Sequence, residues 1–127
     1  METWELDFHW LRVRHVLRDA LGHERLPDLQ ATLMLIGLQE LGRWERSFSK
    51  EEKQDLMHVG TCEVLARGGY YAFAHRDADG WPHYRAVRPV DAVGHEAQEA
   101  LLKRYIIEYL DAWQRADPPT SADALAA

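Results

Sequence analysis

Four side chains between residues 49 and 69 have the types and the spacing that a metal or catalytic site could use. They follow one another at steps of four, three and four residues: Glu51, Asp55, His58 and Cys62. On a helix these steps form one stripe, whose ends would lie about 16 Å apart along the axis. One ion therefore cannot bind all four. A two-ligand site from His58 with Asp55 or Cys62 would need partners from elsewhere, and no HExxH or CxxC motif supplies them.

We therefore interpret the stripe as the polar edge of a packed helix. Cys62 is predicted to be a small core residue and His58 to hydrogen-bond within the helix interface, whereas Asp55 and Glu51 are predicted to be solvated. Catalysis by Cys62 with His58 is not favoured, because such a pair needs an exposed thiolate, an orienting group and an oxyanion site. We expect no cofactor and no metal, and Asp55, His58 and Cys62 are the candidates if one binds.

The helices that must position these residues follow from periodicity and punctuation. Apolar residues recur every three or four positions over residues 4–21, and Gly22 follows as a C-terminal stop. They are Trp4, Leu6, Phe8, Trp10, Leu11, Val13, Leu17 and Leu21. A second helix is predicted to open at Pro27 and to end before Gly42, and its apolar residues on nearly every side place it at the centre of the fold. Gly37 within it predicts a close approach by another element.

The third and fourth helices carry clear start and stop signals. Ser49 and Glu52 predict a capping box, in which each side chain accepts from the backbone N–H of the other residue. This third helix is expected to end at Gly68, and a last helix is expected over about residues 95–113. The remaining residues, 116–127, have little to bury and are predicted to be a disordered tail.

A β-hairpin is predicted between these two helices, at about residues 70–88. The turn sequence DADG predicts a three-residue loop with Gly80 in the left-handed conformation, which places His75 opposite His83. Alternation then predicts one aromatic face, made of Tyr71, Phe73, His75, Trp81, His83 and Arg85. The other face contains mainly alanines. Alternation does not tell which face is buried, so the aromatic face is either a binding surface or part of the core.

The predicted fold class is mainly α. We expect a compact bundle of about four helices with one β-hairpin between the third and the fourth, an order distantly similar to that of winged-helix proteins. Residues 1–115 are expected to form a single helical domain.

Composition limits the class of partner. A net charge of −6 disfavours a general affinity for nucleic acid or for anionic membranes. The longest apolar run, residues 31–38, is too short to cross a membrane. The single cysteine excludes an intrachain disulfide, and the first ten residues do not look like a secretory signal. We therefore expect a cytoplasmic protein that does not bind membranes.

Several strings resemble those of a family of short, uncharacterised bacterial proteins with no assigned activity. They are IGLQELGR, KEEKQDLMH, GYY and DGWPHY, and the resemblance covers residues 6–110. It implies a self-standing unit and supplies no catalytic residue.

The sequence favours binding over chemistry. The main hypothesis is a small interaction or adaptor module that binds a protein partner through the aromatic hairpin face. The alternative is a winged-helix-like protein that binds nucleic acid through the basic hairpin, which carries Arg67, Arg76, Arg85 and Arg88. A second alternative is a small metal-binding protein or enzyme.

Overall fold

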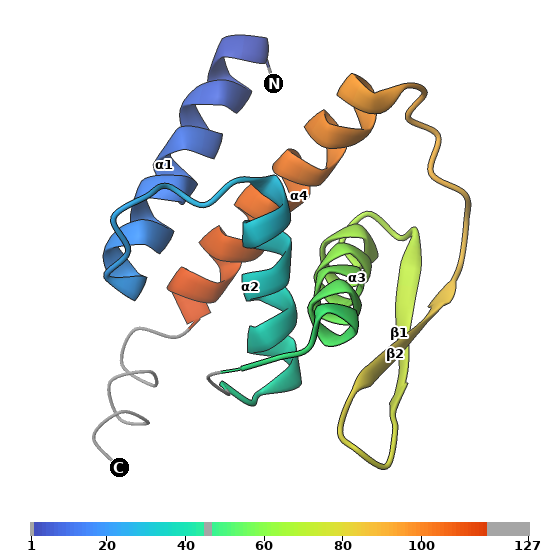
Figure 1. Cartoon of the computed structure of the whole chain (residues 1–127). Helices are drawn as coiled ribbons and strands as arrows, with labels where there is room; N and C mark the ends of the chain where they lie inside the picture. Colours follow the sequence, from blue (N-terminus) through green and yellow to red (C-terminus); the bar gives the residue numbers. More distant parts are fainter. Residues whose placement is uncertain (1, 45–46, 117–127) are drawn as a thin grey trace.

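The computed structural model describes residues 2–44 and 47–116. Its elements, in chain order, are α1 (Thr3–Leu21), α2 (Leu29–Leu41), α3 (Lys50–Ala66), β1 (Tyr71–Arg76), β2 (Pro82–Ala86) and α4 (His95–Ala116). Over the residues described, the fold is mainly α, with four helices and an antiparallel hairpin between α3 and α4, as predicted (Figure 1). Of the predicted tail, Ala116 belongs to α4, and residues 117–127 lie outside the described residues.

Local signals set most helix ends. Gly22 ends α1 with a positive φ of 68°, as predicted. Ser49 begins α3 with the predicted capping box: its Oγ accepts from the N–H of Glu52 at 3.1 Å, and its own N–H donates to the Glu52 carboxylate at 2.9 Å. The start of α2 differs from the prediction. Asp28 is the N-cap and accepts from the N–H of Ala31, so Pro27 lies before the helix and not in its opening turn.

The contact between α2 and α3 depends on two glycines. A Cβ atom at Gly37 of α2 would lie 2.0 Å from the carbonyl oxygen of Leu56 on α3. In return, a Cβ atom at Gly60 of α3 would lie 1.9 Å from the carbonyl oxygen of Leu33 on α2. The two backbones therefore approach more closely than any side chain allows. The close approach predicted at Gly37 is confirmed, and α3 is the element that makes it.

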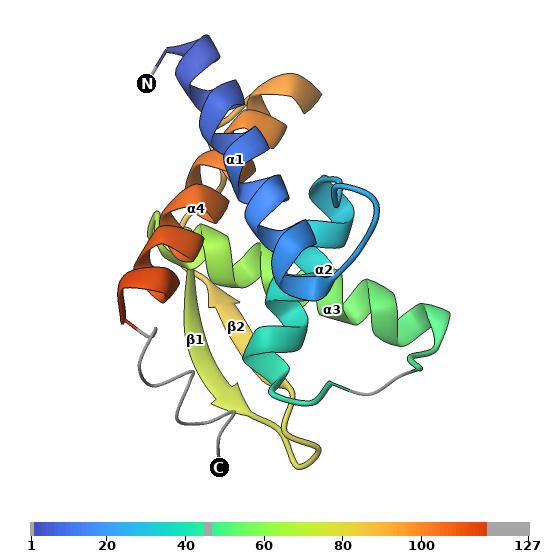
Figure 2. The ribbon, with the colours of Figure 1, turned by 90° about the vertical axis from the view of Figure 1, so that its left-hand side faces the viewer.

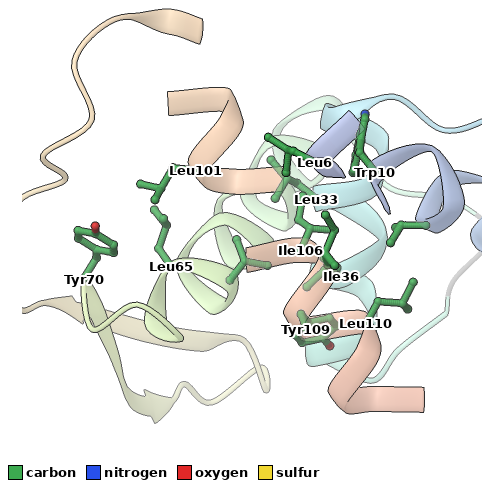
Figure 3. Close-up of a cluster of buried hydrophobic side chains, with 13 residues drawn as sticks. Leu6, Trp10, Leu33, Ile36, Leu65, Tyr70, Leu101, Ile106, Tyr109 and Leu110 are labelled. Atoms are coloured by element: carbon green, nitrogen blue, oxygen red, sulfur yellow. The ribbon is translucent and has the colours of Figure 1, made fainter. Parts of the chain in front are cut away.

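The main core lies where all four helices meet. Side chains from each helix converge there, together with Tyr70 at the start of the hairpin (Figure 3). Val13, Val64 and Ile106 are almost fully buried in this cluster. A smaller cluster between α2 and α3 contains Leu38, Leu41 and Leu56, and Trp81 of the hairpin packs against it. This second cluster attaches the hairpin to the helices.

The hairpin is anchored to α3 on the side of the molecule opposite α1 (Figures 1 and 2). His75 lies opposite His83 and Gly80 has a φ of 89°, both as predicted. A bulge between Phe73 and His75 interrupts the pairing of β1 with β2. Because a bulge adds one residue to one strand, the alternation of β1 changes sides at this point.

Within the part of the chain that the structure describes, no helix has the length and apolar character needed to span a membrane.

Candidate functional site

The stripe of Glu51, Asp55, His58 and Cys62 lies on α3, and we call it the polar stripe. Its residues are divided between the core and the surface. Cys62 is buried, with 1% of its surface exposed, whereas Glu51, Asp55 and His58 are exposed. The Sγ atom of Cys62 lies 3.5 Å from Nε2 of His58. The predictions of Cys62 as a core residue and of Asp55 and Glu51 as solvated are therefore confirmed. His58 contacts Cys62, but its side chain is exposed and does not lie within a packed interface as predicted.

The environment of Cys62 does not favour thiolate chemistry. Burial, with a smaller contribution from the charge of Glu63, raises the pKa of the Cys62 thiol to about 11. The thiol is therefore protonated at neutral pH, and a protonated thiol is a poor nucleophile and a poor metal ligand. Across residues 2–44 and 47–116, no three or more histidine, cysteine, aspartate or glutamate side chains are grouped so that they could hold a metal ion.

The predicted aromatic face is divided between the two sides of the hairpin. The register pairs Phe73 with Tyr84, and cross-strand partners share a side. The hydroxyl of Tyr84 donates to Glu63 of α3 at 2.6 Å, so this side faces the helices. The prediction of one continuous face is therefore wrong for the set Tyr71, Phe73, His75, Trp81, His83 and Arg85. The bulge, which alternation does not anticipate, is the reason.

The six residues have three different environments. Tyr71 packs against the main core and Trp81 against the smaller cluster, so both are partly buried. Phe73 lies on the inner side, but 54% of its surface is exposed. The outer side presents His75, His83 and Arg85, all exposed. The rings of His75 and His83 are stacked, with centroids 4.9 Å apart.

Asp77 stabilises the hairpin turn and holds the side chain of His83. Its Oδ1 accepts from the backbone N–H groups of Asp79 at 2.9 Å and Trp81 at 3.0 Å, and its Oδ2 lies 2.8 Å from Nε2 of His83. The hydrogen bond with His83, followed by that from Trp81, lowers the pKa of Asp77. Sequence reasoning used this residue only as a turn signal. An aspartate at the start of a tight turn commonly accepts from the next backbone groups, and this tendency could have identified its role.

A pocket of about 340 Å³ lies between α3 and the second half of the hairpin. It is lined by Asp55, His58, Val59, Asp77, Trp81, Pro82, His83 and Tyr84. We call it the α3–hairpin pocket. It brings residues of the polar stripe together with residues of the predicted aromatic face, which the sequence suggested only as two separate sites.

Two tyrosine–carboxylate hydrogen bonds lie beneath the hairpin. Besides the bond from Tyr84 to Glu63, the hydroxyl of Tyr109 on α4 donates to the carboxylate of Glu40 on α2. Arg76 of β1 donates to the carbonyl oxygen of Glu40 at 2.7 Å. Together these bonds connect the hairpin to α2 and α3, and α2 to α4. No sequence motif indicated them.

Comparison with family models, with curated proteins and with solved structures finds no match to this chain. The resemblance to a family of short bacterial proteins therefore stays a prediction.

Proposed function

We propose that the protein is a binding module that takes a basic side chain of a partner protein, lysine or arginine, into the α3–hairpin pocket. The observation that carries this proposal is the lining, in which Asp55 and Asp77 lie beside the rings of Trp81 and Tyr84. Carboxylates form charge-assisted hydrogen bonds with guanidinium and ammonium groups, and aromatic rings attract cations. The net charge of −6 also favours the approach of a basic partner.

Preorganisation of the pocket supports the proposal. Asp77 is held by two backbone N–H groups and by His83, and its lowered pKa keeps it ionised at neutral pH. Trp81 is held by its contact with the smaller hydrophobic cluster. A site whose groups are already in place loses less entropy on binding. We also propose a cytoplasmic location, which the single, unpaired and buried Cys62 favours.

Binding of nucleic acid through the hairpin is the less favoured hypothesis. Of the four arginines on which this hypothesis depends, two already form hydrogen bonds within the protein. Arg76 donates to the carbonyl oxygens of Gly80 and Glu40, and Arg88 donates to that of Gly68 and lies over the ring of Tyr70. These contacts leave fewer free donors for phosphate groups.

The test is fluorescence anisotropy with three labelled probes: a peptide rich in lysine and arginine, its glutamate-rich counterpart of the same length, and a double-stranded DNA. We expect binding of the basic peptide only, weakening as salt rises. Asp55→Asn should weaken it about five- to tenfold, since it removes one exposed charge partner. Asp79→Asn is the matched control: it removes the same charge from the hairpin turn, outside the pocket, and should leave the affinity nearly unchanged.

Two results would contradict the proposal. One is equal weakening by Asp55→Asn and Asp79→Asn, which would indicate a general charge effect. The other is binding of DNA that is lost in Arg85→Glu, which would favour the nucleic-acid hypothesis in its place.

A further inference from the structure

The outer face of α1 carries large apolar side chains in contact with solvent. Trp4, Phe8 and Leu11 are 69%, 60% and 44% exposed, respectively. The opposite face of the same helix contributes Leu6, Trp10 and Val13 to the main core. Helix α1 is therefore apolar on two faces, and the four-helix core uses only one of them.

The spacing of the outer residues is that of a coiled-coil seam. Trp4, Phe8, Leu11 and His15 follow one another at steps of four, three and four residues. This alternation of three and four is the spacing by which one helix packs along another. His15 is also exposed. We call these four residues the α1 seam.

The charges beside the seam separate into two halves. The amino-terminal half of α1 is flanked by Glu5 and Asp7, and the middle of its carboxy-terminal half by Arg12 and Arg14. Arg18 and Asp19, in the last turn, pair with each other at 3.1 Å and add no net charge. Intramolecular contacts hold Arg12 and Arg14 in place: Arg12 pairs with Asp111 at 3.2 Å, and Arg14 donates to a backbone carbonyl at 2.7 Å. Each guanidinium has five donors, so further contacts remain open to it.

We propose that the α1 seam binds the α1 seam of a second copy of this chain, in antiparallel orientation. In this arrangement the acidic half of each helix meets the basic half of the other, and Glu5 lies near Arg12 of the second copy. The two helix dipoles are also opposed, which is the favourable arrangement. A parallel pair would place the two acidic halves side by side. The interface is isologous, as expected for a closed dimer.

The register follows from the seam. Phe8 packs against Leu11 of the second copy, and Trp4 packs against its His15. At the exposures given above, the two copies of Trp4 and Phe8 together bury on the order of 400–600 Å². This is about half of what a specific interface needs, and the flanking residues add to it. We therefore expect a reversible dimer with a dissociation constant of about 1–100 μM.

The first experiment is sedimentation equilibrium of the whole chain over a range of concentrations. We expect the native chain to dimerise reversibly. In the double variant Trp4→Glu, Phe8→Glu the dissociation constant of the dimer should be at least tenfold higher. Circular dichroism of this variant should show unchanged helix content, because both positions are exposed. The matched control is Val93→Glu, which places a charge on an apolar residue that is 90% exposed outside α1. This control should dimerise as the native chain does.

The second experiment tests the orientation with a short bismaleimide cross-linker. An equimolar mixture of Trp4→Cys and His15→Cys chains should be cross-linked to a dimer, while either variant alone should not. The native chain controls for Cys62, which is buried. A native chain that stays monomeric at about ten times the upper expected dissociation constant, a dimer that survives the two glutamates, or cross-linking of each variant with itself would overturn the proposal.

Discussion

The surroundings of Glu40 shift the pKa of its carboxyl group in opposite directions. Burial raises its pKa above the ordinary value of 4.5, the hydrogen bond from Tyr109 lowers it, and the nearby charge of Glu63 raises it again. The net effect is a raised pKa. The folded protein therefore binds the Glu40 proton more tightly than the unfolded chain does, and this contribution to stability is complete below pH 4.5 and is lost as the pH rises through the folded pKa.

This sign predicts how Glu40→Gln behaves. Glutamine keeps an oxygen that can accept from Tyr109 but cannot ionise. We expect the free energy of unfolding of the variant to rise, relative to that of the native chain, as the pH increases from 4 to about 7. Urea unfolding at several pH values measures this difference. Glu96→Gln, at an exposed position of α4, controls for the loss of one negative charge. A difference that is constant with pH, or that falls, would show that Glu40 does not carry this linkage.

At the scale of elements, the paired glycines make the α2–α3 contact intolerant of any side chain. By helix propensity alone, alanine at position 37 would be more favourable than glycine by about 1 kcal/mol. Its Cβ, however, would overlap a backbone carbonyl of α3, which cannot move without shifting the helix. We expect Gly37→Ala to lower the free energy of unfolding by about 3 kcal/mol or more.

Urea unfolding of Gly37→Ala, beside Gln39→Ala at an exposed position of α2, measures this cost. The control should change stability by less than about 0.5 kcal/mol. A stabilised Gly37→Ala would mean that propensity outweighs the close approach of the two helices.

Trp81 attaches the hairpin to the helices. It is partly buried against the cluster of Leu38, Leu41 and Leu56. We expect Trp81→Ala to lower the free energy of unfolding by about 2–3 kcal/mol, somewhat less than for a fully buried tryptophan. Phe73→Ala, which removes a mostly exposed ring from the same hairpin, should cost about 1 kcal/mol or less. Similar losses from the two substitutions would mean that the hairpin is not held through Trp81.

The elements show which features the sequence could predict. The capping box of Ser49 and Glu52 and the left-handed Gly80 were predicted because each depends on a few neighbouring residues. The close approach at Gly37 was predicted because glycine is unfavourable inside a helix unless another element packs against it. The bulge in β1 was not, because alternation alone carries no signal for an extra residue. It divided the predicted aromatic face. The pocket was missed for a related reason: Asp55 and Asp77 belong to different elements, and only the packing of the hairpin on α3 brings them together.

At the scale of the whole molecule, the two proposed surfaces lie on opposite sides. Helix α1 is on one side of the bundle and the hairpin on the other (Figures 1 and 2). A dimer formed through the α1 seam therefore leaves both α3–hairpin pockets open. Two open pockets in one assembly would raise the apparent affinity for a partner that carries two basic segments.

The central claim is that a basic side chain enters the α3–hairpin pocket, and nuclear magnetic resonance at Trp81 tests it most directly. The chain has five tryptophans, and the variant Trp81→Phe assigns the indole N–H resonance of Trp81. On titration with the basic peptide, we predict a saturable shift of this resonance and of the backbone amides of Asp55 and His58, with the indole of Trp10 unmoved. The shift should be small with the glutamate-rich peptide. An unmoved Trp81 resonance, or equal shifts with both peptides, would contradict the claim.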